Sequence, residues 1–298
     1  MHIESLQLFN KIAIEKSISK VAINSHISQP ALSQQMQKLE ESVDAKLFER
    51  SNKGIELTSA GKIMEAYSLQ LTQIYENMLE DLGTLKNCSP TFRISAIPEV
   101  GMYGLPCTIK KIKKTLPSYS FNLSIMSSLE VEKQVKNNLA DVGFIIGNSE
   151  DKSLISKAFR LDKILLVSSK NYEIKDKINT KDFANIPLLK LSKDYSTSLL
   201  LNNYANSKGI YASDFYITYT LNSIDSLKTL LLDGNGVAFL PYLAVRKELT
   251  QNQLKIINVE NFNLDYQINM IYNKDMTENS EKIISHFSKH TKCFTCVA

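Results

Sequence analysis

Apolar residues recur at helical spacing through the first forty residues, in short stretches separated by capping and turn residues. The first stretch has one apolar face, formed by Leu6, Phe9, Ile12 and Ala13. Ser17 or Ser19 can cap a second helix. Ser28 is a suitable N-cap for a third, with Pro30 tolerated in its first turn. The pattern therefore predicts three short helices with tight connections.

The predicted third helix separates apolar from polar positions. Its inward positions are Leu32, Met36 and Leu39. Its outward positions are Gln29, Ser33, Gln34, Gln37 and Lys38. The stretch that follows, LFERSNKGIELT at residues 47–58, predicts two short strands around a Ser-Asn-Lys-Gly turn.

A longer helix is predicted from Ser59 to about Leu85, since neither proline nor a turn cluster interrupts it. Apolar side chains form a stripe along it, at Ile63, Tyr67, Leu71, Ile74, Met78, Leu82 and Leu85. Such a stripe on an otherwise polar helix favours pairing with a second copy of itself. Packing against the chain's own domains is the alternative. The stretch KNCSP, residues 86–90, is typical of a linker.

The rest of the chain alternates between strand and helix patterns. Buried strands are predicted in FRISAI, SFNLSIM, DVGFIIG, KILLVSS, IPLLKL, FYITYTL, GVAFLP, LKIINV and YQINMIY. Helical stretches lie between several of them, which indicates an α/β architecture with mostly parallel sheets. The length indicates two lobes rather than one, and no repeat of solenoid period is present.

Composition narrows the class of protein. An apolar fraction of 43% and a charged fraction of 22% are typical of soluble globular proteins. The first residues, MHIESLQLFNKIAIEKS, lack the uninterrupted apolar core of a secretory signal. No apolar run approaches the roughly 20 residues needed to span a bilayer. We therefore expect a cytoplasmic protein with no membrane partner, whose four cysteines are thiols.

Charge is distributed unevenly along the chain. Residues 1–87 carry 9 Lys and Arg against 11 Asp and Glu, a balance of −2, whereas residues 88–298 carry +6. Any nucleic-acid contact in the first part must therefore come from a few well-placed groups rather than from a general positive field.

A short helix, a tight turn and a second helix with an outward amide and hydroxyl face form a helix-turn-helix. Gln and Ser side chains match the donors and acceptors of base edges in the major groove, whereas carboxylates would repel nearby phosphates. Gln29 and Ser33 lie one turn apart near the helix N-terminus, the end that enters the groove. Arg50 and Lys53 are placed like a wing that contacts backbone or minor groove. An amphipathic helix pair with a merely soluble face is the alternative.

The block ISQPALSQQMQKLEESVDAKLFERSNKGIELTSAG, residues 27–61, resembles the most recognisable segment of the LysR-type transcriptional regulators. The long helix is similar to that family's dimerising linker helix, and GNGVAFLP at residues 234–241 to a recurrent segment of its second lobe. The resemblance implies a DNA-binding set of Ser28, Gln29, Pro30, Ser33, Gln34, Lys38, Arg50 and Lys53. Lys38 and Arg50 would contact phosphates. The family often has a basic residue where Gln34 stands, so we expect a shallower salt dependence.

The resemblance also implies the fold class and the domain boundaries. We expect a multidomain α+β chain with a winged helix-turn-helix at 1–58, a dimerising linker helix and hinge at 59–90, and an effector-binding domain at 91–298. That domain would fold like a type II periplasmic binding protein. Lobe I would span about 91–163 plus 268–298 and lobe II about 164–267, with strands crossing near Phe159–Val167 and Tyr266–Tyr272.

A small-molecule effector would bind between the lobes, where strand C-termini and helix N-termini suit small anions. The candidate contacts are Ala96, Ile97, Glu99, Ser127, Ser128, Ser192, Asn222 and Ser223. Helix capping explains the serines and the asparagine equally well. The family often places hydroxyls where Ile97, Pro98 and Glu99 stand. A Glu99 carboxylate that faces the cleft would favour a cationic effector or an amine. A carboxylate that faces solvent would favour neither a cation nor an anion. The basic excess of residues 88–298 indicates an anionic effector instead.

The C-terminal tail concentrates potential metal ligands, at His286, His290, Cys293 and Cys296. Such nitrogen and sulfur donors suit zinc or copper(I), and a CxxC pair can also cycle between thiol and disulfide. A tail that binds nothing is the leading interpretation, so we expect no resident cofactor and keep zinc as a hypothesis.

The leading hypothesis is therefore a ligand-responsive transcription regulator. Its partners would be double-stranded promoter DNA, further copies of itself in a homodimer or homotetramer, a small-molecule effector and, as an option, RNA polymerase. An enzyme is disfavoured because G-x-S-x-G, G-x-x-x-x-G-K-[ST], G-x-G-x-x-G and H-E-x-x-H patterns are absent from the sequence. A metal- or thiol-responsive regulator and a solute-binding protein without a DNA role are the alternatives.

Overall fold

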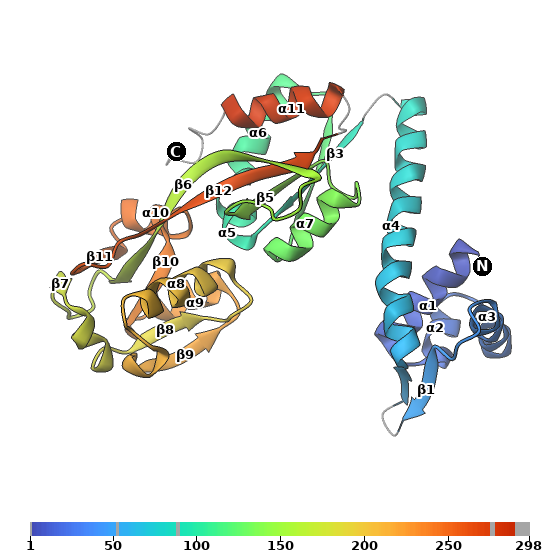
Figure 1. Ribbon diagram of the computed structural model, residues 1–298, viewed down its shortest axis with the longest axis horizontal. Helices are drawn as coiled ribbons and strands as arrows, with labels where there is room; N and C mark the ends of the chain where they lie inside the picture. The colour runs from blue at the N-terminus through green and yellow to red at the C-terminus, as the bar shows by residue number, and fades with distance from the viewer. Residues whose placement is uncertain (1, 52–53, 88–89, 275–277, 290–298) are drawn as a thin grey trace. The chain divides into compact units, whose positions relative to one another are not determined.

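The structure, a computed structural model, describes residues 2–51, 54–87, 90–274 and 278–289. It divides into two compact units, Met1–Cys88 and Ser89–Ala298, whose elements are labelled in Figure 1. None of the helices in these ranges is long and apolar enough to cross a membrane.

The first unit is a three-helix cluster followed by a hairpin and a long helix. Its elements are α1 (Ile3–Glu15), α2 (Ile18–Asn24), α3 (Gln29–Ser42), β1 (Phe48–Ser51), β2 (Gly54–Leu57) and α4 (Ser59–Asn87). The predicted inward residues form one core, which includes Leu6, Phe9, Ile12, Leu32, Met36 and Leu39. Ser17 and Ser28 are the N-caps of α2 and α3, so the capping predictions are confirmed.

The long helix α4 packs against α1 through small polar side chains. Asn10 of α1 accepts a hydrogen bond from Ser68 Oγ (2.5 Å) and donates one to Thr72 Oγ1 (3.5 Å). The predicted apolar stripe does not take part in this packing. Its described members Ile63, Tyr67, Leu71, Ile74, Met78 and Leu82 are all exposed, between 44% and 64%. Packing within the unit therefore leaves the stripe without a partner.

The second unit is built on one sheet, which counts ten strands among the described residues. The strands are β3 (Thr91–Ala96), β4 (Ser120–Ile125), β5 (Val142–Ile146), β6 (Leu154–Ser169), β7 (Lys177–Ile178), β8 (Leu188–Leu191), β9 (Ile217–Leu221), β10 (Val237–Pro241), β11 (Leu254–Val259) and β12 (Leu264–Asn273). The order is β4-β3-β5-β12-β6-β10-β8-β9, with β11 paired to β6 and β7. Strands β3, β4 and β5 at one end run parallel, as do β8, β9 and β10 at the other.

Helices cover both ends of this sheet (Figure 1). The first group is α5 (Pro98–Tyr103), α6 (Leu105–Thr115), α7 (Ser128–Lys136) and α11 (Glu278–Lys289), at the β4 end. The second group is α8 (Ser196–Ser207) and α9 (Ile224–Leu232) at the β9 end, α10 (Tyr242–Thr250) against β6, β10 and β11, and the short η1 (Thr180–Ala184) and η2 (Ala212–Asp214). We call the first group with β3, β4 and β5 lobe I, and the second with β7 to β11 lobe II.

Two long antiparallel strands, β6 and β12, join the lobes. They pair with each other from Leu154–Asn273 to Ile164–Leu264, with one irregularity at Ile268 and Asn269. Strand β12 then pairs with β5 in lobe I, and β6 with β10 in lobe II. The predicted crossing segments lie in these strands, but β6 begins at Leu154, earlier than expected. The prediction of mostly parallel sheets holds within each lobe and fails at the joining strands.

Candidate DNA interface and interlobe seam

The outward face of α3 presents amide and hydroxyl groups to solvent. Gln29, Pro30, Ser33, Gln34 and Lys38 are all exposed. Ser28 starts the helix, because its Oγ accepts a hydrogen bond from the backbone N–H of Ala31 (3.3 Å). The predicted DNA-reading residues of this helix therefore share one accessible surface, and Ser28 also holds its N-terminus in shape.

One of these side chains is held in place by the preceding helix. Gln29 Oε1 accepts a hydrogen bond from Ser19 Oγ of α2 (3.0 Å). Because the amide oxygen is used, the NH₂ group of Gln29 is left as the donor that can meet an acceptor on a base edge. Ser19 thus holds the Gln29 side chain, whereas the sequence predicted it only as a candidate capping residue.

The second predicted contact region is the β1–β2 hairpin. Arg50 lies in β1, where its backbone pairs with Ile55 of β2. Lys53 lies outside the described residues. The hairpin that the sequence predicted as a wing is confirmed in its strands, and the contacts of its basic side chains stay a prediction.

Glu40, near the end of α3, connects this helix to the hairpin. Its Oε1 accepts hydrogen bonds from the backbone N–H groups of Leu47 (2.8 Å) and Phe48 (3.2 Å). Its Oε2 accepts a hydrogen bond from Lys46 Nζ (2.8 Å). Partial burial opposes ionisation of Glu40, but these bonds outweigh it and the pKa lies below its ordinary value. Spacing along the helix gives no sign of this contact, because Leu47 and Phe48 lie beyond the end of α3.

Of the effector residues predicted after β3, Ala96 and Ile97 lie in the hydrophobic core, and Glu99 contacts the other lobe. Ala96 and Ile97 are fully buried in the hydrophobic core, so their side chains serve packing. Glu99 is also fully buried, yet it reaches across to lobe II, where Thr197 Oγ1 donates a hydrogen bond to its Oε1 (2.5 Å). Burial raises the pKa of Glu99, and the hydrogen bonds from Thr197 offset part of that rise. The orientation that the sequence left open is therefore toward the other lobe.

The predicted serines and the asparagine lie at or next to helix N-termini, except Ser192, which follows the end of β8. Ser127 forms a capping box with Glu130 on α7, and Ser223 caps α9 by accepting from the backbone N–H of Ser226 (3.2 Å). Ser192 bonds Asp194 locally (3.1 Å). Asn222 is exposed, and its backbone carbonyl accepts a hydrogen bond from the hydroxyl of Tyr195, the residue that precedes α8 (3.2 Å). Ser128 alone in this group spans the lobes, since its hydroxyl lies 2.8 Å from that of Ser196.

Sequence reasoning missed a third contact across the lobes. The hydroxyl of Tyr103, at the end of α5, donates a hydrogen bond to Asp225 of α9 (2.7 Å). Lys228 lies over the Tyr103 ring, 4.8 Å from its centre, and Arg246 donates to the Tyr103 carbonyl (2.9 Å). Burial and the Asp225 carboxylate raise the pKa of Tyr103, so its hydroxyl stays protonated. We call the contact formed by Glu99, Tyr103, Ser128, Ser196, Thr197 and Asp225 the seam.

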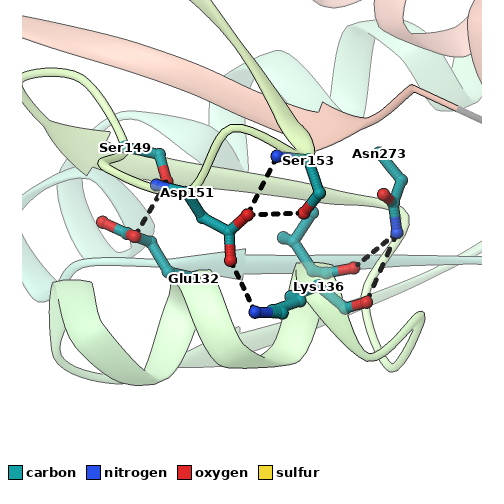
Figure 2. A network of polar contacts seen from close by, with 7 residues as sticks. Glu132, Lys136, Ser149, Asp151, Ser153 and Asn273 are labelled. Atoms are coloured by element: carbon teal, nitrogen blue, oxygen red, sulfur yellow. Dashed lines mark hydrogen bonds and ion pairs between the residues drawn. The ribbon is translucent and has the colours of Figure 1, made fainter.

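A polar network holds the C-terminal half of α7 against the segment before β6 and the end of β12 (Figure 2). Lys136 pairs with Asp151 (2.7 Å), and this pairing lowers the pKa of the Asp151 carboxyl well below its usual range. Ser149 donates to Glu132 (2.8 Å). Asn273 at the end of β12 donates to the last carbonyl groups of the helix (3.3 and 3.4 Å). The last carbonyl groups of a helix have no partner inside it, and Asn273 supplies one here. With the capping box at Ser127, α7 therefore has side-chain hydrogen bonds at both ends.

The proposed metal ligands of the tail are not brought together in the described part of the chain. His286 lies in α11, whereas His290, Cys293 and Cys296 fall outside the described residues. Among the residues that the structure describes, no group of three His, Cys, Asp or Glu side chains is arranged to hold a metal ion. The zinc hypothesis therefore stays a prediction for the tail.

Comparisons with known proteins cover both units. Residues 3–62 match the family model for bacterial regulatory helix-turn-helix proteins of the lysR family, and residues 88–289 match the LysR substrate binding domain. A probable RuBisCO transcriptional regulator from Thalassiosira pseudonana is 27% identical over 281 residues, which are 92% of each chain.

Two solved structures have the same fold. The crystal structure of CbnR, a LysR family transcriptional regulator, has a TM-score of 0.77 at 14% identity and covers 98% of this chain and all of CbnR. Full-length CbnR in complex with its target DNA has a TM-score of 0.74 at 16% identity, over 99% of this chain and all of that one. With both family models matched in order along the chain, the protein belongs to the LysR family of DNA-binding transcription regulators.

Proposed function

We propose that this regulator reads its operator through the exposed face of α3, with Gln29 and Ser33 contacting base edges. The observation that carries the proposal is the row of exposed amide and hydroxyl groups at the N-terminal end of a helix that begins at Ser28. Each can donate and accept hydrogen bonds, as base edges in the major groove require. Ser19 supports this role by fixing the oxygen of Gln29.

The phosphate contacts are proposed for Lys38 and for the wing residues Arg50 and Lys53. Lys38 is exposed on the same helix face, and Arg50 lies in the hairpin that Glu40 ties to α3. Phosphate contacts position a protein on the duplex without reading its sequence. Base-reading and phosphate-binding variants should therefore fail in different ways.

The experiment begins with selection of bound sequences from random duplex DNA by the full-length protein, followed by gel-shift competition. We expect Gln29→Ala and Ser33→Ala each to reduce discrimination at one operator position by about 1–3 kcal/mol, with weaker effects on unrelated DNA. Arg50→Ala should weaken binding to all sequences alike and reduce the salt dependence. If both α3 variants keep the full operator preference, the assignment of α3 as the reading helix is wrong.

We further propose that a small molecule bound between the lobes changes their closure and thereby the arrangement of the DNA-binding units. The support is the seam, where three hydrogen bonds between side chains join lobe I to lobe II. A ligand that binds one arrangement of the lobes more tightly shifts the population toward it. We also propose that the protein forms a homotetramer and contacts RNA polymerase. The number and spacing of half-sites in the selected operator sequences test how many DNA-binding units one particle carries.

A further inference from the structure

The seam contains a buried carboxylate, that of Glu99, of which only one oxygen has a hydrogen-bond partner among the described residues. Glu99 is fully buried, and its Oε1 is bonded by Thr197 Oγ1 of α8. Its other oxygen, Oε2, is buried without a hydrogen-bond partner in the described part of the chain. A buried carboxylate oxygen without a partner costs free energy, so proteins rarely leave one unless another group occupies the position in some state.

Glu99 also occupies the place where an anion would bind. Helix α8 starts after Tyr195, whose carbonyl accepts from the N–H groups of Ser198 and Leu199 but whose side chain caps none of the first N–H groups. The Glu99 carboxylate lies at this helix end from the opposite lobe, since the hydroxyl of Thr197, in the first turn of α8, donates to it. An anionic effector at this helix end would have to displace a tethered carboxylate.

The charges around Glu99 are of both signs, since Arg160 lies near Asp162 and Arg246 donates to the Tyr103 carbonyl. Asp162, which accepts hydrogen bonds from Tyr266 (2.8 Å) and the Leu243 N–H (3.3 Å), acts on Glu99 as a like charge. Lys228, the nearest cation of α9, is already paired with Asp225 and Glu248 (3.2 and 2.9 Å). Charge alone therefore does not set the sign of a ligand here, and the feature that does is the open acceptor, Glu99 Oε2.

We infer that the effector of this protein carries a cationic nitrogen, an ammonium or guanidinium group, which binds Glu99 Oε2 at the seam. The inference rests on the proposed effector function and specifies its ligand class. A nitrogen cation supplies the missing donors and neutralises Glu99, whereas the anion position at the start of α8 is already filled. Glu99 thereby sets specificity for the charge of the ligand, because a negatively charged ligand would meet the buried carboxyls of Glu99 and Asp162.

The test uses full-length protein and two probes of matched length, 1,4-diaminobutane and succinate, in thermal-shift and calorimetric titrations. L-Argininamide and agmatine extend the amine set. We expect the amine probes to raise the melting temperature of the wild type and succinate to leave it unchanged. Glu99→Gln, which keeps the size and the bond to Thr197, should weaken amine binding about tenfold or more. Glu173→Gln, an exposed carboxylate of lobe II, is the control and should bind as the wild type does.

A second variant tests whether Glu99 occupies the anion position. Glu99→Ala opens the space at α8, so acetate should raise its melting temperature relative to chloride at equal ionic strength, and should not do so for the wild type. Stabilisation of the wild type by succinate, no stabilisation by any of the amines, or equal amine affinity in Glu99→Gln would each overturn the inference. A gel shift of the wild type without ligand distinguishes failure of this inference from failure of the proposed function. A wild type that does not bind DNA would contradict the proposed function, whereas the ligand titrations alone decide the inference.

Discussion

Glu40 illustrates how one residue can fix α3 and the β1–β2 hairpin relative to each other. Its carboxylate accepts from two backbone N–H groups before and within β1, and from Lys46. We expect Glu40→Gln to lower the free energy of unfolding of the first unit by about 1–2 kcal/mol at pH 7, because hydrogen bonds to an ionised group are lost. Differential scanning calorimetry measures this, and Glu41→Gln, the exposed neighbour, should change stability by less than about 0.5 kcal/mol.

The same contact predicts a dependence on pH. The pKa of Glu40 is lower in the folded chain than its usual 4.5, so folding favours the ionised form. Its stabilising contribution is complete above about pH 4.5 and is lost as the pH falls through the folded-state pKa. The difference between the wild type and Glu40→Gln should therefore shrink in acid. An unchanged difference down to pH 3 would contradict the assigned role of the carboxylate.

Single residues also show where prediction from sequence ends. The inward and outward positions of α3 follow from spacing alone, because helical periodicity is local. The orientation of Glu99 does not, since its partner Thr197 lies 98 residues further along the chain and in the other lobe. Sequence reasoning identified the carboxylate as the unusual group and left its direction open for that reason.

At the scale of elements, the first turn of α4 packs closely against the backbone that precedes β1, and Gly61 makes this close approach possible. A Cβ at Gly61 would lie 2.1 Å from the carbonyl oxygen of Leu47, which is backbone and cannot rotate away. We expect Gly61→Ala to destabilise the first unit by about 1–3 kcal/mol. A Cβ at Gly83 on the same helix would meet no atom within 4 Å, so Gly83→Ala should stabilise by up to about 1 kcal/mol. Urea unfolding of both variants checks the contrast, and equal shifts in the same direction would refute it.

Strands were predictable where an apolar run marks a buried segment, and less so where pairing alone defines them. β3, β5 and β10 are almost wholly buried and match their predicted stretches closely. β6 begins nine residues before the predicted KILLVSS. These nine residues include Lys157, Arg160 and Asp162 and are held by the ladder to β12, a long-range pairing that local hydropathy does not record. The two-residue β7 left no signal for the same reason.

At the scale of the whole molecule, the unpartnered stripe of α4 predicts the assembly. Six described apolar side chains along this helix remain exposed, while Asn10, Ser68 and Thr72 form the contact with α1. Coiled-coil pairing of two α4 helices would bury them and bring together two reading helices. Two such helices can then enter major grooves about 34 Å apart, which gives an operator with two half-sites.

Charges placed within the stripe should separate folding from assembly. Leu71→Glu with Ile74→Glu puts two carboxylates in the middle of the proposed helix pair, where burial of unpaired charge is unfavourable, so we expect a folded monomer in analytical ultracentrifugation. Gln73→Glu adds a charge to the same turn at an exposed position off the stripe and should leave the oligomer intact. On DNA, the double variant should lose the advantage of an operator with two half-sites over one with a single half-site, because linked binding requires both reading helices in one particle. A double variant that remains dimeric and keeps this advantage would show that α4 is not the surface that pairs the two copies.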